Sequence, residues 1–562
     1  MGRANSPFHK RSQTSEHSDG TDISDESDDT GRIERFDATG VPGLDEILGG
    51  GLPRGALVLV MGVPGSGKTT IASQIALVAA RSGRRALVLT ALSESTGKLL
   101  THLSTYSFFD AALVGGPAQF FNLQAVLTQG LRAVADQIIS EVRRVKADVL
   151  MLDGFRGMAT VDSDAHAARE FLFNLGTTLG ALGITTLITS ETDPRDPTFY
   201  PETTTADVIL GLHYQLAGVR QYRGIEVIKS RGAAPMPGLH ALVVGKDGAE
   251  VYAQLEERVA AVTLGTEAQT QGAMPSPSLA RPLDPRRARA IFDLPELDAM
   301  LRGGIPTNTC TLLAGSLGTG KTLLAIHFAL AGARAGEKTV FLGFREDREQ
   351  LLLEASPFAI GPELERELKP GGMITFLEVP PIKLNADIVA DGLLAEIDRT
   401  GATRLVVDSI AELERTIARG LDPARLEDYL AAFLRALRAL KVTPLLVKES
   451  DRALAPTLDF STDRLSVLAE NLILLQQVPY KGKLHRVLSI LKVRLSAHDN
   501  TLREFRIAPP KGIDVLEVFE SEVGMLQDIT SVQDRVRMGE DRNDQADIAS
   551  RRERARRRKE DS

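Results

Sequence analysis

A glycine-rich pattern that occurs twice constrains the fold of this chain more than any other feature. Gly62 to Thr69 reads GVPGSGKT and Gly315 to Thr322 reads GSLGTGKT, so both segments match G-x-x-x-x-G-K-[ST]. Each copy follows a strand-like apolar run and opens an apolar helical run, which is the context that a phosphate-binding loop requires. The pattern predicts a turn from strand to helix at both places.

The two loops belong to a longer internal repeat. The first copy reads FDATGVPGLDEILGGGLPRGALVLVMGVPGSGKTTIASQIAL and the second FDLPELDAMLRGGIPTNTCTLLAGSLGTGKTLLAIHFAL. The loop lysines, Lys68 and Lys321, stand 253 residues apart (321 − 68), which is the size of one α/β domain. We therefore expect an α/β protein with two tandem P-loop domains, each with a mainly parallel central sheet and flanking helices.

The spacing within each loop suits a phosphate ligand, although a plain glycine turn into a helix is the alternative. Glycines let successive backbone N–H groups face the phosphates, the lysine reaches the β- and γ-phosphates, and the hydroxyl of Thr69 or Thr322 ligates Mg²⁺. The sequence thus predicts ATP and Mg²⁺ as ligands, with Lys68 and Lys321 also candidates for catalysis. The candidate nucleotide-binding residues are Gly62, Gly65, Ser66, Gly67, Lys68, Thr69 and Thr70, and Gly315, Gly318, Thr319, Gly320, Lys321, Thr322 and Leu323.

A second metal ligand is expected at the end of a neighbouring strand. ADVLMLDG supplies Asp153 and TRLVVDSI supplies Asp408, at offsets of 85 (153 − 68) and 87 (408 − 321) from the loop lysines. An aspartate that closes an apolar run is ordinarily a strand-end cap, but the matched offsets favour magnesium ligation.

A carboxylate near the γ-phosphate is needed to activate a water molecule or a hydroxyl group. After the next strand, ALVLTALSES offers Glu94, and VFLGFRED offers Glu346 and Asp347. We take Glu94 and Glu346 as candidate catalytic residues. The alternative for each is a solvated loop carboxylate.

Composition excludes several classes of protein. The net charge is −8 (66 − 74), so no global basic field draws the chain onto nucleic acid, which we regard as an improbable partner. The one cysteine, Cys310, forms no intramolecular disulfide and suits a reducing cytoplasm. We see no apolar run long enough for a membrane span and therefore expect a cytoplasmic protein.

Composition shifts divide the chain into five parts. Residues 1–31 are predicted to be a disordered acidic arm, and residues 526–562 a charged tail whose end is basic. The two ATPase domains are expected at 32–260 and 285–525, joined by a Pro/Ser/Gln-rich linker at 261–284. Both tails are candidate contacts for regulatory protein partners, and a solvated tail is the alternative.

With these features in place, the chain resembles the circadian clock protein KaiC family, a branch of the RecA-like P-loop ATPases. The distinctive passages are LILLQQVPYKGKLHRVLSILKVRLSAHDNTLREF in the second repeat and GIEVIKSRG in the first. The resemblance covers about residues 32–260 and 285–525. It implies two RecA-like domains, assembly as a homohexamer and ATP bound between neighbouring subunits.

The resemblance also implies that certain cations reach the nucleotide held by the next subunit. At matching positions these are Lys229 and Arg231 in the first repeat, and Lys492, Arg494 and His498 in the second. Charge complementarity to a γ-phosphate supports this role. Surface cations on a strand are the alternative.

The chain departs from the family where adjacent glutamates are expected. It carries Ser93-Glu94 in the first repeat and Arg345-Glu346 in the second, so the first glutamate, implied to be the general base, is absent from both. Either the remaining glutamates take over its task or turnover is slow.

A second departure concerns autophosphorylation. The resemblance implies an adjacent Ser and Thr as phosphoacceptors in the second repeat, and the matching positions here are Ser466 and Val467. One acceptor hydroxyl therefore remains, and a buried or capping serine is the alternative.

Three functional hypotheses follow. The leading one is a hexameric, regulatory, KaiC-like ATPase whose second domain acts as a serine/threonine autokinase on Ser466. The second is a nucleotide-dependent assembly scaffold with little turnover. The third is a RecA-like DNA motor, which the acidic composition disfavours.

Overall fold

The chain folds as two compact units that divide between Gly265 and Thr266, and we call them the first and second unit. The computed structural model describes residues 36–519 except 92–94, 160–164, 197, 199, 218–219, 271–287, 383, 421, 450–463, 481–482 and 495. The expected acidic arm, the charged tail from residue 526 and Glu94 lie outside the described residues.

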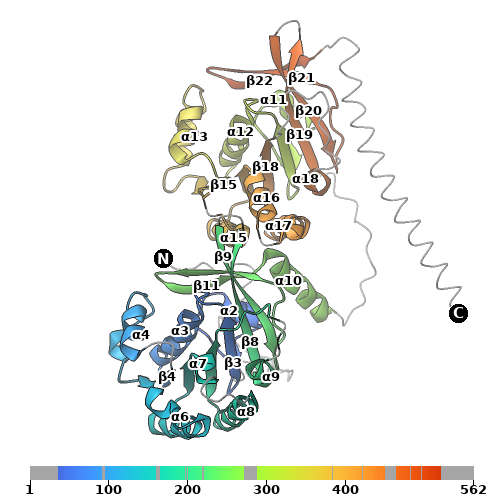
Figure 1. The fold of residues 1–562 in the computed structure, drawn as a ribbon. Coiled ribbons are helices and arrows are strands. Elements are labelled where there is room, and N and C mark those ends of the chain that lie inside the picture. The colour runs from blue at the N-terminus through green and yellow to red at the C-terminus, as the bar shows by residue number, and fades with distance from the viewer. Residues whose placement is uncertain are drawn as a thin grey trace, which may run out of the picture. The chain divides into compact units, whose positions relative to one another are not determined.

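The first unit alternates strands and helices, as its repeat of apolar runs predicts (Figure 1). Its elements are β1 (Phe36–Asp37), α2 (Leu44–Leu48), β2 (Leu52–Pro53), β3 (Leu57–Gly62), α3 (Lys68–Arg81), β4 (Ala86–Thr90), α4 (Thr96–Leu103), the 3₁₀ helix η1 (Ala111–Leu113), β5 (Ala118–Asn122), α5 (Gln124–Leu127), α6 (Leu131–Val145), β6 (Val149–Asp153), α7 (Phe155–Ala159), α8 (Ala165–Ala181), β7 (Thr185–Ser190), α9 (Pro201–Thr205), β8 (Val208–Ala217), β9 (Arg220–Ser230), β10 (His240–Gly245), β11 (Gly248–Tyr252) and α10 (Leu255–Thr270).

Nine strands of the first unit form one sheet in the order β11-β10-β9-β8-β3-β7-β6-β4-β5. The strands from β8 to β5 in this order are parallel, and β9, β10 and β11 extend the sheet with antiparallel pairing. The P-loop strand β3 is central, because β7 and β8 flank it. The carboxyl ends of the parallel strands therefore gather at one edge, beside the loop.

Helices cover both faces of this sheet. Alternate residues of a strand point to opposite faces, so Val58 and Val60 of β3 join a core with α3, while Leu57 and Leu59 join another with α6 and α8. A strand buried on both faces reads as a continuous apolar run, which is why LVLVMG shows no polar alternation.

The second unit has the same order of strands, with some differences in the helices between them (Figure 1). They are β12 (Arg289–Ala290), α11 (Pro295–Met300), β13 (Ile305–Pro306), β14 (Thr311–Gly315), α12 (Lys321–Arg334), β15 (Thr339–Gly343), α13 (Arg348–Ala355), α14 (Gly361–Glu367), β16 (Ile374–Glu378), α15 (Ala386–Thr400), β17 (Arg404–Asp408), α16 (Ala411–Ala418), the 3₁₀ helix η2 (Pro423–Arg425), α17 (Leu426–Ala439), β18 (Thr443–Glu449), α18 (Arg464–Leu468), β19 (Asn471–Tyr480), β20 (Lys483–Val493), β21 (Arg503–Ala508) and β22 (Gly512–Val518).

The sheet of the second unit repeats the first strand for strand. Its order is β16-β15-β17-β18-β14-β19-β20-β21-β22, with β14 in the place of β3. The run from β16 to β19 is parallel, and β20, β21 and β22 are antiparallel. Two tandem RecA-like α/β domains are thus confirmed.

Helix α10 runs to Thr270, ten residues into the segment expected to be a linker. Its last ten residues, AVTLGTEAQT, contain Ala, Leu, Glu and Gln, which are good helix formers, and they extend a helix begun by Leu255. The polar composition that suggested a linker therefore did not mark the end of the helix.

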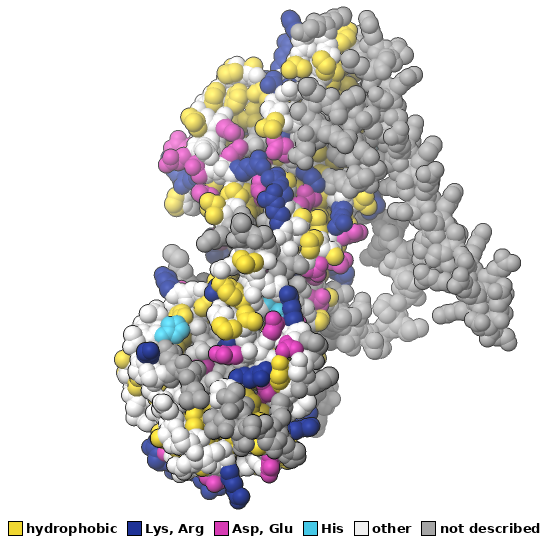
Figure 2. All heavy atoms as spheres, viewed as in Figure 1, with side chains coloured by type: hydrophobic (Ala, Val, Ile, Leu, Met, Phe, Trp, Pro, Cys, Tyr) yellow, Lys and Arg dark blue, Asp and Glu magenta, His cyan; other side chains and the backbone are white. Residues whose placement is uncertain are grey.

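The described residues include no helix that is long and apolar enough to cross a membrane. Figure 2 shows one face of the molecule, where basic and acidic side chains are interspersed on the described surface of each unit. A mixed surface differs from the single-sign basic track that binds a nucleic-acid backbone.

Candidate functional site: the two phosphate-binding loops

The loop of the first unit joins the carboxyl end of β3 to the first turn of α3. Gly65 and Gly67 have φ angles of 80° and 108°, which side chains with a Cβ rarely adopt, so the glycines are needed to form the loop. Lys68 begins α3, and its ammonium donates hydrogen bonds to the carbonyl oxygens of Gly62 at 2.8 Å and Val63 at 3.2 Å. The lysine is therefore folded over the loop that is to hold the phosphates.

Behind this lysine lies a hydroxyl–carboxylate pair. Thr69 Oγ1 donates a hydrogen bond to Asp153 Oδ1 at 3.1 Å, and Asp153 ends β6 at 4% exposure. Thr189 of β7 donates a second bond to the same oxygen at 2.7 Å and accepts one from the N–H of Gly154. Two neighbouring strand ends and the first turn of α3 thus fix the carboxylate that the sequence proposed as a magnesium ligand.

The second unit repeats this geometry. Gly318 and Gly320 have φ angles of 69° and 90°, and Lys321 donates a hydrogen bond to the carbonyl oxygen of Ser316 at 2.7 Å. Thr322 Oγ1 donates to Asp408 Oδ2 at 2.8 Å. Burial raises the pKa of Asp408, while the hydrogen bond from Thr322 and the charge of Lys321 oppose that rise.

The remaining loop positions of the prediction line the same turns. Thr319 Oγ1 donates to the carbonyl oxygen of Ser316 at 2.8 Å, and Leu323 is 8% exposed on α12. In the first unit Thr70 lies on α3, with its hydroxyl 3.4 Å from that of Tyr106. The structure brings both predicted loop sets together, each within its own unit.

A cavity of about 450 Å³ opens at the loop of the second unit. It is lined by loop residues, by the carboxylates at the strand ends and by apolar side chains: Leu317, Gly318, Gly320, Lys321, Thr322, Leu323, Ile326, Arg345, Glu346, Glu354, Phe358, Asp408, Ser409, Val447, Glu449 and Ile507. A concave site with convergent charges and an apolar wall is typical of a ligand pocket.

Glu346 stands in this cavity beside a second acid. Burial raises its pKa to about 7, and the nearby charges of Glu354 and Asp408 add to the effect. Glu354, on α13, likewise has a raised pKa because of burial and the charge of Asp408. Glu346 is therefore a partly neutral carboxyl group at neutral pH when no ligand is bound.

Arg345 places a cation where the family resemblance implied a glutamate. Its guanidinium pairs with Glu412 on α16 at 2.8 Å and with Glu449 at the end of β18 at 3.3 Å. The side chain is 52% exposed and lines the cavity. The implied general base is thus replaced here by a cation that holds two carboxylates.

The sequence prediction missed one contact that both units make. Arg223 of β9 donates a hydrogen bond from Nε to the carbonyl oxygen of Gly65 at 3.3 Å, and Arg486 of β20 does the same to Gly318 at 3.3 Å. The two arginines occupy matching positions, each as the fourth residue of the second strand in the β8–β9 and β19–β20 hairpins. In each copy the arginine stands six residues before the lysine of the Lys-x-Arg run. This repeated spacing was a signal that could have identified both residues.

Lys229 and Arg231 lie away from the loop of their own unit. Lys229 pairs with Ile209 of β8, which pairs with Leu59 of β3, three residues before Gly62. At roughly 3.3 Å per residue this level is about 10 Å from the loop along the sheet. Lys229 donates hydrogen bonds to main-chain carbonyls at residues 204 and 206, and burial lowers its pKa.

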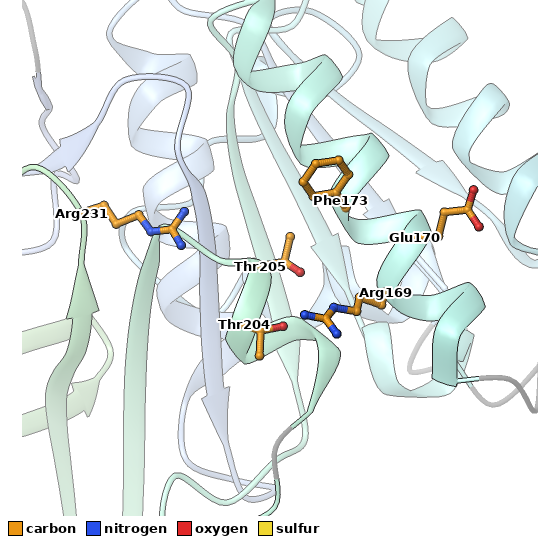
Figure 3. Close-up of a pocket in the computed structure, with 6 residues that line it drawn as sticks. All are labelled: Arg169, Glu170, Phe173, Thr204, Thr205 and Arg231. Atoms are coloured by element: carbon orange, nitrogen blue, oxygen red, sulfur yellow. The ribbon is translucent and has the colours of Figure 1, made fainter.

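Arg231 borders a separate cavity of about 440 Å³ (Figure 3). Its guanidinium pairs with Asp207 at 3.2 Å. The other lining residues come from α8 and α9, and they are Arg169, Glu170, Phe173, Thr204 and Thr205. Two arginines thus line a cavity near the amino-terminal ends of the parallel strands, whereas the P-loop lies at their carboxyl ends.

The predicted cations of the second unit have the corresponding position. Lys492 pairs with Leu472, which pairs with Leu312 of β14, three residues before the first loop glycine. Arg494 follows β20 and His498 lies four residues further on, where burial lowers the pKa of the His498 imidazole. The structure therefore does not bring these cations to the loop of their own unit.

Ser466 lies near them on α18. Lys492 Nζ donates a hydrogen bond to the main-chain oxygen of Ser466 at 3.5 Å, and Ser466 is 8% exposed, whereas Val467 is 58% exposed. The proposed phosphoacceptor is therefore mostly covered within this unit.

The residues around each loop suit a magnesium nucleotide. A threonine hydroxyl and an aspartate carboxylate meet at each site, and Mg²⁺ prefers such oxygen ligands. Ser66 Oγ and Ser316 Oγ are buried in the loops without a hydrogen-bond partner among the described residues. Buried hydroxyls of this kind need a partner, which loop-bound phosphate oxygens would supply.

Fold and site together define the class. A parallel sheet, a glycine-rich loop at a helix N-terminus and a strand-end aspartate behind it make each unit a RecA-like P-loop domain. The family model described as "ATPase: KaiC" matches residues 38–256 and 293–520, one match for each unit. The chain therefore belongs to the KaiC ATPase family.

Curated relatives span most of the chain. The "Circadian clock oscillator protein KaiC" of Picosynechococcus sp. is 25% identical over 480 residues, covering 83% of this chain and 87% of the relative. "Circadian clock oscillator protein KaiC 1" of Synechocystis sp. is 26% identical over 496 residues, covering 86% and 89%. "Circadian clock protein KaiC3" of the same organism is 25% identical over 522 residues, covering 89% and 95%.

Proposed function

We propose that this chain is a regulatory ATPase that works as a ring of six copies in the cytoplasm, with magnesium ATP bound by each P-loop at the boundary between copies. The observation that carries the proposal is the duplicated Lys–Thr–Asp geometry, in which each loop lysine stands in front of a threonine–aspartate hydrogen bond. Both units therefore have the parts needed to hold a triphosphate and its metal.

The residues of each site divide the chemistry between them. Mg²⁺, when bound, supplies positive charge that neutralises the β- and γ-phosphate oxygens. Lys321 adds a second cation, the backbone N–H groups of the loop orient the phosphates, and Asp408 with Thr322 holds the metal side of the site. Burial lowers the pKa of Lys321, but the charges of Glu449 and Asp408 oppose this and favour its charged form.

Assembly into a ring explains the cations that lie far from their own loop. Arg231 lines a cavity together with Arg169, and Lys229 lies two residues before Arg231, away from the P-loop end of the sheet. A cation contributes to phosphoryl transfer only where it meets the developing charge. Subunits arranged head to tail would bring these cations of one copy to the loop of the next, and a closed head-to-tail arrangement forms a ring.

Native mass spectrometry of the full chain with and without ATP and Mg²⁺ tests this assembly. We expect hexamers whose abundance rises with the nucleotide, and ADP formation that accompanies them, because the site would be completed only between copies. An Arg231→Ala variant should weaken the ATP-dependent assembly or its turnover. A monomer under all conditions would contradict the ring.

We further propose that the second domain transfers the γ-phosphoryl group to Ser466. In such a transfer Ser466 Oγ forms a bond to the γ-phosphorus, the bond from that phosphorus to the β,γ-bridging oxygen breaks, and the hydroxyl proton passes to a carboxylate while ADP leaves. Ser466 precedes β19, whose start is level with the start of β14. The donor would accordingly be the nucleotide of a neighbouring copy.

Ser466→Ala should remove phosphate incorporation from γ-labelled ATP. We expect label on the wild-type chain, mapped to Ser466 by mass spectrometry, and loss of nearly all of it in the variant, because Val467 offers no hydroxyl. Ser356→Ala, which changes an exposed serine of the second unit, controls for label elsewhere. A wild-type chain that stays unlabelled would rule out the kinase activity.

A nucleotide-dependent scaffold is the second candidate, and Arg345 is the observation that favours it. The cation pairs with Glu412 and Glu449 where a general base was implied, so nucleotide binding can persist while hydrolysis is slow. Turnover by the purified assembly separates the two functions. Tight binding without ADP formation would favour the scaffold.

A further inference from the structure

The strongest carboxylate influence on each loop lysine comes from a glutamate that the sequence prediction did not consider. Burial lowers the pKa of Lys68, and Glu191 opposes this more than Asp153 does. Burial likewise lowers the pKa of Lys321, and Glu449 opposes this more than Asp408 does. In both units, therefore, a glutamate raises the pKa of the loop lysine more than the strand-end aspartate does.

The two glutamates occupy the same place in the two sheets. Glu449 ends β18 and pairs with Gly315, the first glycine of the loop. In the first unit Ser190 of β7 pairs with Met61, so the next residue, Glu191, is level with Gly62. The repeat therefore preserves this carboxylate at the carboxyl end of the strand beside the P-loop strand.

Their depth separates them from the metal carboxylates. Asp408 pairs with Val447 of β18, two residues before Glu449. At about 3.3 Å per residue, Glu449 lies roughly 7 Å further toward the edge at which the nucleotide enters. A carboxylate placed beyond the metal ligand faces the region of the terminal phosphate and of the water that attacks it.

Glu449 is also held in place by a cation. Its carboxylate is 20% exposed, lines the cavity together with Lys321 and accepts the guanidinium of Arg345 at 3.3 Å. Glu346, by comparison, shares a hydrogen bond with Glu354, and its pKa is raised to about 7. Glu449 pairs instead with the cation of Arg345, which orients its carboxylate in the cavity.

We propose that Glu449 in the second unit, and Glu191 in the first, orients the attacking water and accepts its proton, and this rests on the ATPase activity proposed above. The water oxygen forms a bond to the γ-phosphorus while the bond from that phosphorus to the β,γ-bridging oxygen breaks. ADP leaves with the bonding electron pair, the carboxylate takes one proton from the water, and that proton is then released to phosphate or solvent. Arg345 serves as a positioning residue for Glu449.

Glu449→Gln tests this in the full chain with Lys68→Ala, so that the remaining turnover reports the second unit. The amide keeps the size of the side chain and its contact with Arg345 but cannot accept a proton. We expect single-turnover ADP formation to fall about 100-fold, the usual scale of general-base catalysis. The dissociation constant for a non-hydrolysable ATP analogue with Mg²⁺ should not increase, because the variant loses no cation.

Matched variants make the result specific. Glu427→Gln changes an exposed carboxylate at the start of α17 and should turn over like its parent. Glu191→Gln in the Lys321→Ala chain should reproduce the loss in the first unit, and it provides an independent result if Glu449→Gln does not fold. Glu346→Gln is measured in parallel to compare the two acids of the cavity.

Each outcome has a distinct meaning. A parent chain that hydrolyses ATP, together with Glu449→Gln and Glu191→Gln variants that do so within about threefold of it, would overturn the assignment while the ATPase proposal stands. If only Glu346→Gln slowed ADP formation, Glu346 would be the general base. If analogue binding weakened in proportion to the loss of the hydrolysis rate, the glutamate would have a binding role instead. A parent chain without turnover would overturn both the ATPase proposal and the glutamate assignment.

Discussion

Replacing both loop lysines by alanine is expected to weaken nucleotide binding at both sites, and each single replacement to weaken it at one of the two. Lys68 and Lys321 are the cations that begin α3 and α12, and each ammonium already caps loop carbonyl oxygens. Hydrogen bonds to charged groups are worth about 1.5–3 kcal/mol each. Losing them at the triphosphate should weaken binding at that site by about 10- to 100-fold.

Isothermal titration calorimetry with a non-hydrolysable ATP analogue and Mg²⁺ measures how many analogue molecules each chain binds. The wild-type chain should bind two molecules per chain, one for each loop, and Lys68→Ala or Lys321→Ala should bind one at the same ligand concentration. Because hydrolysis also needs this cation in the transition state, turnover in the altered unit should fall by about 10²- to 10³-fold.

Exposed lysines provide matched controls for the two units. Lys246 lies at the turn between β10 and β11, and Lys369 pairs with Glu365 at the surface of the second unit. Alanine at either position should leave the stoichiometry unchanged. A double variant of the loop lysines that still bound two analogue molecules would place the nucleotide sites elsewhere.

The parts of the site that the sequence predicted are those fixed by local structure. A glycine-rich turn between a buried strand and a helix has one well-known geometry, so the loops and their order along the chain followed from the motif. Asp153 and Asp408 followed from matched offsets and the rule that parallel strands end at one edge. The doubly repeated order of nine strands likewise reflects the internal repeat.

The parts that it missed depend on pairing between distant segments. Arg223 and Arg486 reach a loop glycine only because an antiparallel hairpin extends past the P-loop strand, about 160 residues later in the chain. Glu449 became visible only through the register that sets it level with Gly315. A single sequence does not give that register, because the register depends on which strands pair in the fold.

A buried arginine in the second unit is another feature that the sequence did not predict. Val149 and Arg404 are the first residues of β6 and β17, the two strands that end at Asp153 and Asp408. The first unit has a small apolar side chain at this position, and the second has a guanidinium that is 2% exposed. Its surroundings, and not its strand pattern, determine that it is buried.

Arg404→Met is expected to destabilise the second unit by about 3 kcal/mol, the lower end of the cost of breaking a buried ion pair. The guanidinium bonds Glu337 and donates to the main-chain oxygens at residues 291 and 328, at 2.9 and 2.8 Å. It also lies 4.7 Å above the ring of Phe328. Methionine fills the volume but removes the partner of Glu337 and the hydrogen bonds to both main-chain oxygens, and such losses cost free energy.

Differential scanning calorimetry should detect this loss as a lower midpoint for one of two transitions. For a unit of this size the shift is about 6–12 °C, and the transition of the first unit should not move. Arg399→Met provides the control, because Arg399 is 57% exposed and pairs with Glu396 on the same helix, and an exposed pair contributes about 0–1 kcal/mol.

The same substitution connects stability to the site. Arg404 anchors the beginning of β17, and Asp408 at its other end accepts the hydrogen bond of Thr322 at the second loop. Near the lowered midpoint, nucleotide binding by the second unit should therefore be lost before that of the first. Saturating ATP and Mg²⁺ should restore part of the midpoint, since a ligand that binds the folded state stabilises it. A variant that melts within about 2 °C of the wild type would show that the guanidinium network contributes little.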